Sequence, residues 1–278
     1  MDQIMKFLEA MQRGMIRLAI GADGPVVWGR TRFGGRPDVP ADFEWPTFTA
    51  DTFYDDTVKP RPLAFLAQFD CGALAPMDPE GLLPRSGLLS FFYELGSARW
   101  GFDPADAGCA RVYWFDSTEP LSPAPFPKDL EDEFRLPRLR IQAKPDRSYA
   151  SWADFEQIQP DDSLFEQYIE AYETVGGSGE CSKLLGWPDV IQDNMTLECE
   201  LVSRGYNLGG LEDIPPTISD REGAASLQNW RLLFQLDSFE MDDFDLNFGD
   251  SGALYFYIRT EDLKAHRFDR VWVILQCS

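Results

Sequence analysis

Apolar positions near the start of the chain follow the period of a helix. They recur every three or four residues, at Ile4, Phe7, Leu8, Met11 and Met15. This spacing predicts an amphipathic helix with one apolar stripe, which Gly14 is expected to weaken or end. A second helix is predicted after Ser163, because Ser163 and Glu166 fit a capping box, and Gly176-Gly177 is expected to stop it.

Short apolar runs elsewhere in the chain predict strands. Three lie in the first half and three in the second, at residues 63–70, 88–93, 111–115, 231–237, 253–258 and 270–276. Glycine and proline make residues 31–46 an expected ordered loop. Residues 121–137 are rich in proline and acid and predict an irregular connection, while residues 207–229 lack periodicity and predict a long surface excursion.

The predicted strands of the two halves contain matching residues. Both halves have Gln-x-Asp, then Ser-Gly before an aromatic strand: Gln68, Asp70, Ser86 and Gly87 in one, Gln235, Asp237, Ser251 and Gly252 in the other. The third strands correspond loosely. These matches predict an internal repeat. The expected fold is α+β, with two similar strand-rich halves at residues 1–145 and 146–278, mainly antiparallel sheets and a few flanking helices. The halves are expected to form one compact unit.

The Gln-x-Asp pairs are the first candidate for a binding site. Residues two apart in a strand share a face, so each glutamine points the same way as its aspartate. Two interpretations stay open. The pairs satisfy backbone groups of nearby loops, or they line a two-fold-related polar cleft between the halves that binds a small polar ligand. The candidate ligand-binding residues are Gln68, Asp70, Gln235, Asp237, Asp250, Trp45 and Trp187.

Two tryptophans and one aspartate complete that set. Trp45-Pro46 and Trp187-Pro188 each precede a Gln-x-Asp strand, as if they belonged to the same repeat. Each indole is expected either to fix a loop by donating to a carbonyl group or to form a stacking platform for a ligand. Asp250 precedes Ser251-Gly252, where the glycine permits a turn at the entrance of a strand, and no Gly-x-Ser-x-Gly nucleophile motif is matched.

The balance of charges limits the partners of this chain. Its 278 residues have a formal net charge of −22. Such an acidic surface repels phosphate groups, which argues against nucleic acid and anionic membranes, and no apolar run is long enough to span a bilayer. The charge serves solubility or attracts a basic protein partner. Five cysteines, without Cys-x-x-Cys or an expected signal peptide, predict reduced thiols and a cytoplasmic location.

The sequence contains few residues for catalysis. His266 is the single histidine, so a multi-histidine metal site is impossible and a Ser-His-Asp triad would depend on it. The common phosphate-binding glycine motifs are absent, and residues 243–247 lack the glycine and glutamate that complete an EF-hand loop. No cofactor or metal is predicted. The leading hypothesis is a noncatalytic binding or protein-interaction module. The alternative is a carboxylate-based, hydrolase-like enzyme that acts on a small polar ligand between the halves.

Several motifs together resemble the YwqG-like family of uncharacterised, mainly bacterial proteins. They are Gly34-Gly35-Arg36-Pro37, Trp45-Pro46, Leu66-Ala67-Gln68-Phe69-Asp70, Leu184-Leu185-Gly186-Trp187-Pro188, Leu233-Phe234-Gln235-Leu236-Asp237 and Gly249-Asp250-Ser251-Gly252. The likeness runs from about residue 30 to the C-terminus. Phe248 stands where the family often has tryptophan, and residues 181–183 lack a histidine that is frequent there. The resemblance implies an α+β protein with two similar halves, and it implies no catalytic residues.

Overall fold

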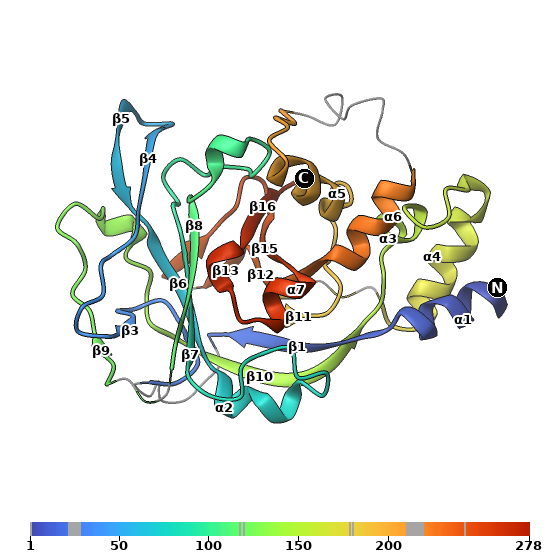
Figure 1. Ribbon diagram of the computed structural model, residues 1–278, viewed down its shortest axis with the longest axis horizontal. Coiled ribbons are helices and arrows are strands. Elements are labelled where there is room, and N and C mark those ends of the chain that lie inside the picture. Colours follow the sequence, from blue (N-terminus) through green and yellow to red (C-terminus); the bar gives the residue numbers. More distant parts are fainter. Residues whose placement is uncertain are drawn as a thin grey trace.

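A ten-stranded antiparallel sheet dominates the structure (Figure 1). The computed structural model describes residues 2–21, 29–116, 118, 120–177, 179, 181–209, 220–241 and 243–278. In sheet order, the strands are β16 (Trp272–Gln276), β15 (Ala253–Arg259), β12 (Trp230–Asp237), β11 (Lys183–Leu185), β1 (Arg13–Ile20), β10 (Leu139–Ser148), β2 (Arg32–Phe33), β6 (Ala64–Asp70), β7 (Leu88–Tyr93) and β8 (Ala110–Phe115).

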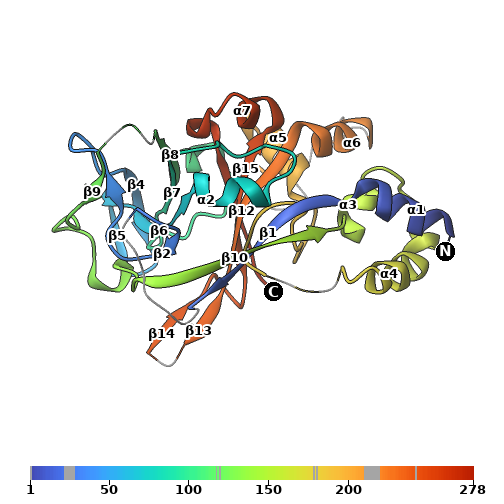
Figure 2. The same cartoon turned by 90° about the horizontal axis from the view of Figure 1, so that it is seen from below.

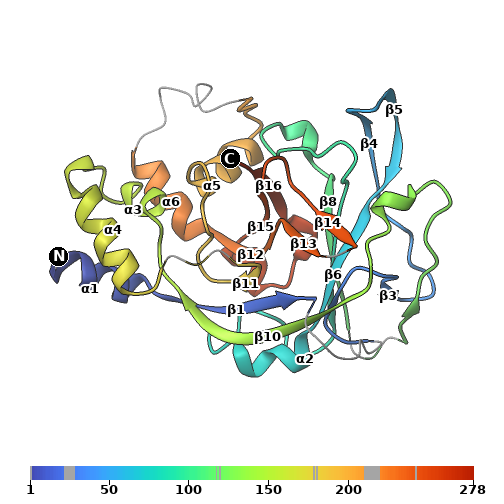
Figure 3. The ribbon, with the colours of Figure 1, turned by 180° about the vertical axis from the view of Figure 1, so that it is seen from behind.

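Smaller elements surround this sheet. Three strand pairs lie outside it: β4 (Thr47–Thr52) with β5 (Asp55–Pro62), β13 (Phe239–Met241) with β14 (Phe244–Leu246), and β3 (Asp38–Val39) with β9 (Ser122–Pro123). The α-helices are α1 (Asp2–Met11), α2 (Cys71–Leu74), α3 (Trp152–Glu156), α4 (Phe165–Thr174), α5 (Met195–Ser203), α6 (Asp220–Asn229) and α7 (Thr260–Lys264). Helices α1, α3 and α4 lie at one end of the molecule and β4–β5 at the other (Figure 3), and β13–β14 projects beyond β10 (Figure 2).

The outer strands form two quartets with the same arrangement. β2, β6, β7 and β8 follow one another both in the chain and in the sheet, and so do β11, β12, β15 and β16. The two central strands cross between them, because β1 pairs with β11 and β10 pairs with β2. β1 and β10 also pair with each other along their full registered length, from Arg13↔Ser148 to Ile20↔Ile141. β1 of the first half thus borders the second quartet, while β10, which contains residue 145, borders the first quartet.

Aromatic side chains join the two quartets across the main core. The sheet curls so that β6 and β7 face β12 and β15, with Phe69 and Phe91 packed against Phe234 at ring-centroid distances of 5.2 and 4.8 Å. Phe91 also contacts Phe256 at 5.2 Å. All four rings are buried. Because neighbouring residues of a strand point to opposite faces, the polar residues beside these rings point to the outer faces of the quartets.

The structure confirms a strand-rich α+β fold with a large antiparallel sheet, and each predicted strand overlaps an observed one. The outer face of β12, β15 and β16 is covered by α5, whose Met195 and Cys199 pack on the aromatic and aliphatic side chains of Trp230, Leu232, Tyr255, Tyr257 and Ile274. This covering leaves the end of β12 accessible, which is where the pocket described below lies.

Three local predictions were wrong. Met15 belongs to β1 rather than to the first helix, which ends at Met11. The side chain of Ser163 does not cap α4; Asp161 caps the preceding 3-10 turn, and the capping box is formed by Ser151 and Asp154 on α3. Part of the expected surface excursion is helix α6, while residues 210–219 lie outside the described residues. The half boundary expected near residue 145 stays a prediction, and residue 145 lies within β10.

Among the described residues, no helix has the length and apolar character needed to cross a bilayer.

Replacing Phe234 with alanine tests whether the quartets share one core. Phe234→Ala leaves a cavity against Phe69 and Phe91, and we expect it to lower the free energy of unfolding by about 3–5 kcal/mol. Urea unfolding followed by far-UV circular dichroism and by tryptophan fluorescence should give coincident transitions in both proteins. Two separated transitions in the wild-type protein would contradict the shared core.

Candidate functional site

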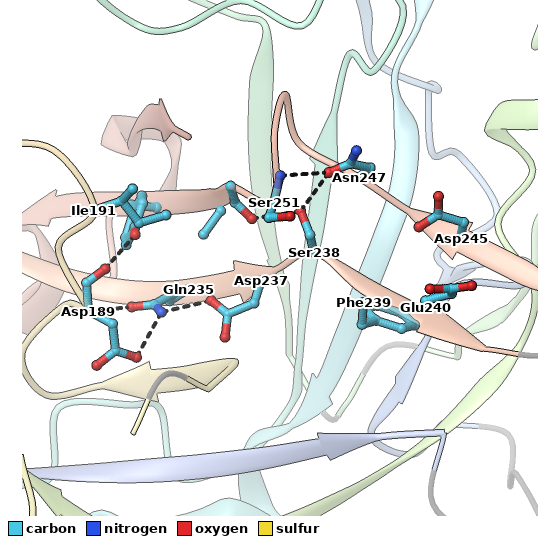
Figure 4. A pocket seen from close by; sticks show the side chains of 13 residues that line it. Asp189, Ile191, Gln235, Asp237, Ser238, Phe239, Glu240, Asp245, Asn247 and Ser251 are labelled. Carbon is cyan, nitrogen blue, oxygen red and sulfur yellow. Dashed lines mark hydrogen bonds between the residues drawn. The ribbon is translucent and has the colours of Figure 1, made fainter. Parts of the chain in front are cut away.

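Gln235, at the end of β12, is the centre of a buried polar network. Its side chain is 1% exposed, and its Oε1 accepts a hydrogen bond from the backbone N–H of Asp189 at 2.9 Å. Its Nε2 donates to Asp189 Oδ2 at 2.9 Å and to Asp237 Oδ1 at 2.8 Å (Figure 4). The buried ammonium group of Lys183 lies 2.6 Å from Asp189 Oδ1. The carboxylate of Asp189 is therefore the common partner of the Lys183 ammonium group and the Gln235 amide.

Gln68, at the end of β6, has the same kind of surroundings. Its Oε1 accepts from the backbone N–H of Asp38 at 3.1 Å, and its Nε2 donates to Asp38 Oδ2 at 2.9 Å and to Arg30 O at 3.1 Å. The buried guanidinium of Arg32 lies 2.7 Å from the same Asp38 oxygen. Arg32, Gln68 and Asp38 thus correspond to Lys183, Gln235 and Asp189.

A tight turn places each carboxylate beside its cation. In both networks the aspartate follows the cation by six residues, as Arg32…Asp38 and Lys183…Asp189. Two consecutive residues with positive φ form each turn: Gly34 (54°) and Gly35 (72°), and Leu185 (61°) and Gly186 (82°). Glycine is the residue that adopts this conformation without strain, so Leu185 is the exceptional member.

The sequence signal for this network is Gly-x-Pro-Asp-Val, which occurs at residues 35–39 and 186–190. In these contacts Trp187-Pro188 corresponds to Arg36-Pro37, which corrects the comparison with Trp45-Pro46 made from the sequence. Pro37 and Pro188 are the residues that precede the two buried aspartates, whereas Trp45 lies beyond β3. Asp38 and Asp189 were therefore missed as members of the two polar networks.

Both tryptophans fix parts of the chain. Trp45 Nε1 donates to Leu63 O at 2.9 Å, and Trp187 Nε1 donates to Met11 O at 2.7 Å. Trp187 is 1% exposed, and the guanidinium carbon of Arg13 lies 3.3 Å from its ring centroid. The indole of Trp187 is therefore covered by protein.

The two predicted aspartates outside the network differ in their contacts. Asp70 accepts from the backbone N–H of Ala73 at 3.1 Å and so caps α2, and it pairs with Arg30 at 2.5 Å. Asp250 is exposed, and its backbone oxygen accepts from Ser278 N at 3.2 Å. Asp70 thus has a structural role at the start of α2.

The two Gln-x-Asp pairs do not come together. Phe69 and Phe234 pack against each other in the core, so Gln68 and Gln235 point away from one another. A pocket at the end of β12 is lined by Gln235 and Asp237, and by neither Gln68 nor Asp70. The expectation that both pairs line one cleft between the halves is corrected accordingly.

This pocket has a volume of about 520 Å³ and lies between β12, the start of β15 and the β13–β14 hairpin. Four residues of its lining carry carboxylates, and no lysine or arginine is among them: the four are Asp189, Asp237, Glu240 and Asp245. Gln235, Asn247, Ser238 and Ser251 add neutral polar groups. Figure 4 shows Glu240 and Asp245 beside each other at one end and Asp189 with Gln235 at the other.

The β13–β14 hairpin brings two carboxylates face to face. Glu240 and Asp245 are direct cross-strand partners. On the other face, Phe239 and Phe244 pack on Phe33 with ring centroids 5.3 and 6.1 Å away, which holds the hairpin in place. Like charges directly opposite each other destabilise a strand pair. The arrangement suits a site that receives positive charge.

Metal binding has no preassembled site in the part of the chain that the structure describes. No group of three or more histidine, cysteine, aspartate or glutamate side chains is arranged there to hold an ion. The lining of the pocket offers hydrogen-bonding groups and carboxylates. An organic cation with several N–H donors matches it.

A strongly perturbed carboxyl group lies outside the pocket, on α5. Burial raises the pKa of Glu198 to about 8, and the charge of Asp193 adds to the effect. Glu198 is 6% exposed and its Oε2 has no hydrogen-bond partner among the described residues. A perturbed carboxyl in a cleft would suggest acid–base chemistry, but Glu198 is not part of the pocket lining. We therefore expect the ionisation of Glu198 to change the free energy of unfolding.

Replacing Asp189 tests the buried network. Lys183 Nζ, Gln235 Nε2 and the backbone N–H of Cys181 all donate to this carboxylate, so the amide nitrogen of Asp189→Asn finds no acceptor. We expect a loss of about 3 kcal/mol in the free energy of unfolding, because Lys183 stays buried without a countercharge. Lys183→Met combined with Asp189→Asn removes both charges and should recover part of it. Chemical denaturation measures the stability of the double variant and of Lys183→Met and Asp189→Asn alone. A double variant whose loss equals the sum of the two single losses would contradict this account.

Replacing Glu198 tests the pH dependence of stability. The folded-state pKa of about 8 lies above the ordinary 4.5, so the unfolded chain releases this proton first as pH rises. Stability from this group is present below pH 4.5 and is lost between pH 4.5 and 8, by up to about 1.4 kcal/mol per pH unit. Glu198→Gln should lack this slope. Denaturation curves at pH 5, 6.5 and 8 should show the variant gaining on the wild-type protein, and parallel curves would contradict the assignment.

Comparison with known proteins assigns most of the chain, including the site, to one protein family. A family model described as Domain of unknown function (DUF1963) matches residues 31–277. No curated protein matches the chain. The matched span includes both buried networks and every residue that lines the pocket. The chain belongs to the DUF1963 family, whose function is unknown.

Proposed function

We propose that this protein is a noncatalytic binding module whose pocket between β12, β15 and the β13–β14 hairpin holds the cationic group of a ligand. The observation that supports this most is the lining, which has carboxylates from four residues and no lysine or arginine. A guanidinium or ammonium group there interacts favourably with several carboxylates at once. Phe239, which is partly exposed, lines the same pocket and offers aromatic surface to such a cation.

Glu240 and Asp245 are the expected direct contacts of the cation. Asp189 already pairs with Lys183, and Asp237 accepts from Gln235. Glu240 and Asp245 stand opposite each other, and no lysine or arginine of the described residues forms an ion pair with either. A cation between them replaces their mutual repulsion by two attractions.

The ligand is a basic protein partner or a small polar molecule with a positive group. The net charge of −22 attracts such ligands over a longer range and accelerates their association at low ionic strength. The cytoplasm is the expected compartment, because all five cysteines are free thiols and four of them are buried. The motifs named above support the YwqG-like subgroup and a bacterial source.

Duplication of an ancestral unit accounts for the framework of this site. Besides the two buried networks, two further features support it. Thr31 Oγ1 accepts from Asp70 N at 3.0 Å, as Ser182 Oγ accepts from Asp237 N at 3.0 Å. Each glutamine strand also has a register shift three residues before its glutamine, at Phe65/Ala67 in β6 and at Leu232/Phe234 in β12.

Neutralising the hairpin carboxylates tests the proposed pocket. In the variant Glu240→Gln/Asp245→Asn, affinity for N-acetyl-arginine amide should fall at least tenfold, because the attraction is lost while shape is kept. The free variant should be slightly more stable, by at most about 0.5 kcal/mol, because a like-charge pair at an exposed position is removed. Isothermal titration calorimetry at low salt measures binding, and thermal unfolding measures stability.

The matched control is Glu170→Gln/Glu173→Gln, which changes the net charge equally on α4 at the other end of the molecule (Figure 1). It should bind like the wild-type protein. N-acetyl-citrulline amide, which has the shape of the arginine probe without its charge, should bind neither protein. Equal affinity for the arginine and citrulline probes, or equal losses in both variants, would overturn the proposed function.

A further inference from the structure

A second pocket adjoins the first. It has a volume of about 750 Å³ and lies between the tip of the β4–β5 hairpin, the segment 131–136 and β14. The two pockets share Asp245 and Asn247, so the end of β14 forms a common wall. Figure 3 shows β14 pointing toward the chain below β4–β5. A ligand longer than a single side chain can therefore pass from one pocket into the other.

The second pocket has the same charge as the first. Asp55, Glu131 and Glu133 contribute carboxylates together with Asp245, and its lining contains no lysine or arginine. Asp55 is already neutralised, since Lys59 and Arg61 lie 2.8 and 2.9 Å from it and hold its pKa below the usual range. Glu131 and Glu133 are exposed. Glu131 Oε1 lies 3.9 Å from Arg61 Nη1, which is longer than a hydrogen bond, so both carboxylates can contact a ligand.

Exposed aromatic residues at the rim are an independent sign of binding. Phe53 and Tyr54 at the tip of β4–β5 are 89% and 91% exposed, and their rings meet edge to face with centroids 5.1 Å apart. Tyr54 also lines the second pocket. Neighbouring exposed aromatic side chains are unfavourable in water, and aromatic residues are common at the energetic centres of interfaces. A planar guanidinium stacks on such rings while it pairs with carboxylates, which a lysine ammonium does less well.

We infer that the two pockets form one docking surface for an extended, arginine-containing segment of a protein partner. This rests on the proposed function for the first pocket and adds the class of partner. One cationic side chain occupies the pocket at Glu240 and Asp245. An arginine occupies the second pocket beside Glu131, Glu133 and Tyr54. In an extended segment, residues two or four apart point the same way, so such spacings present two side chains to one surface.

Peptides with one or two arginines test this docking surface. Fluorescein-labelled peptides of equal length contain either one arginine or two, with one, three or five glycine and serine residues between them. At one spacing at least, the two-arginine peptide should bind about tenfold or more tightly than the one-arginine peptide, because the second contact becomes intramolecular. Fluorescence anisotropy at 50 and 500 mM salt measures affinity, which should weaken at the higher salt.

Variants of the second pocket separate the two proposals. Glu131→Gln/Glu133→Gln should remove the advantage of the second arginine and leave one-arginine binding unchanged. Tyr54→Ser changes a side chain that is 91% exposed, so folding is unaffected, and it should weaken the two-arginine peptide more than its lysine counterpart. Glu170→Gln/Glu173→Gln is the charge-matched control and should change nothing.

Several outcomes would overturn the inference. If no spacing improves on one arginine, the second pocket takes no part, while the first pocket keeps its proposed function. If spermine binds as tightly as the two-arginine peptide and Tyr54→Ser has no effect on it, the surface binds polyamines and not a protein segment. If Phe53→Ser/Tyr54→Ser turns a dimer into a monomer in analytical ultracentrifugation, the hairpin tip contacts a second copy of this chain. If no peptide binds at all, the proposed function fails as well.

Discussion

A largely buried carboxylate, that of Asp189, which accepts hydrogen bonds from three groups, is the constraint on which the site depends. Asp189 receives the ammonium of Lys183, the amide of Gln235 and the backbone N–H of Cys181. A charge taken out of water is tolerated only when it is paired and hydrogen-bonded, so these groups cannot move independently. The network fixes the turn at Leu185 and Gly186 and the orientation of Gln235. Gln235 in turn holds Asp237 at the floor of the pocket through a 2.8 Å hydrogen bond.

Packing in the core decides on which side of the sheet these networks lie. The aromatic rings of Phe69, Phe91, Phe234 and Phe256 fill the space between the two quartets. Strand alternation then directs each glutamine outward, where Gln68 donates to Asp38 and Gln235 donates to Asp189. Two polar pairs that match in sequence therefore lie on opposite outer faces. A ligand site can form at the end of one strand without involving its counterpart.

Much of the fold is predictable from the sequence, because strands buried on both faces have nearly continuous apolar runs, as in β6 and β12. The pairing of β1 with β11 and of β10 with β2 was not predictable, since it depends on contacts between distant segments. Gln235 and Asp237 were found from their spacing. Glu240 and Asp245 were missed because hairpin register, which makes them direct partners, is not visible as a motif. Arg32 and Lys183 were not identified from the sequence as buried cations; each is paired with a carboxylate six residues further along the chain.

The chain follows different paths after the two aspartates. After Asp70 the chain enters α2, which Asp70 caps, and Arg30 neutralises the carboxylate. After Asp237 the chain instead continues into the β13–β14 hairpin, whose carboxylates meet the end of β12. The carboxylate oxygens of Asp70 are occupied by the α2 cap and by Arg30. The hairpin, in contrast, places the carboxylates of Glu240 and Asp245 in the same pocket as Asp237. With a similar polar network beneath both, the segment that follows each strand determines which side chains surround the strand end.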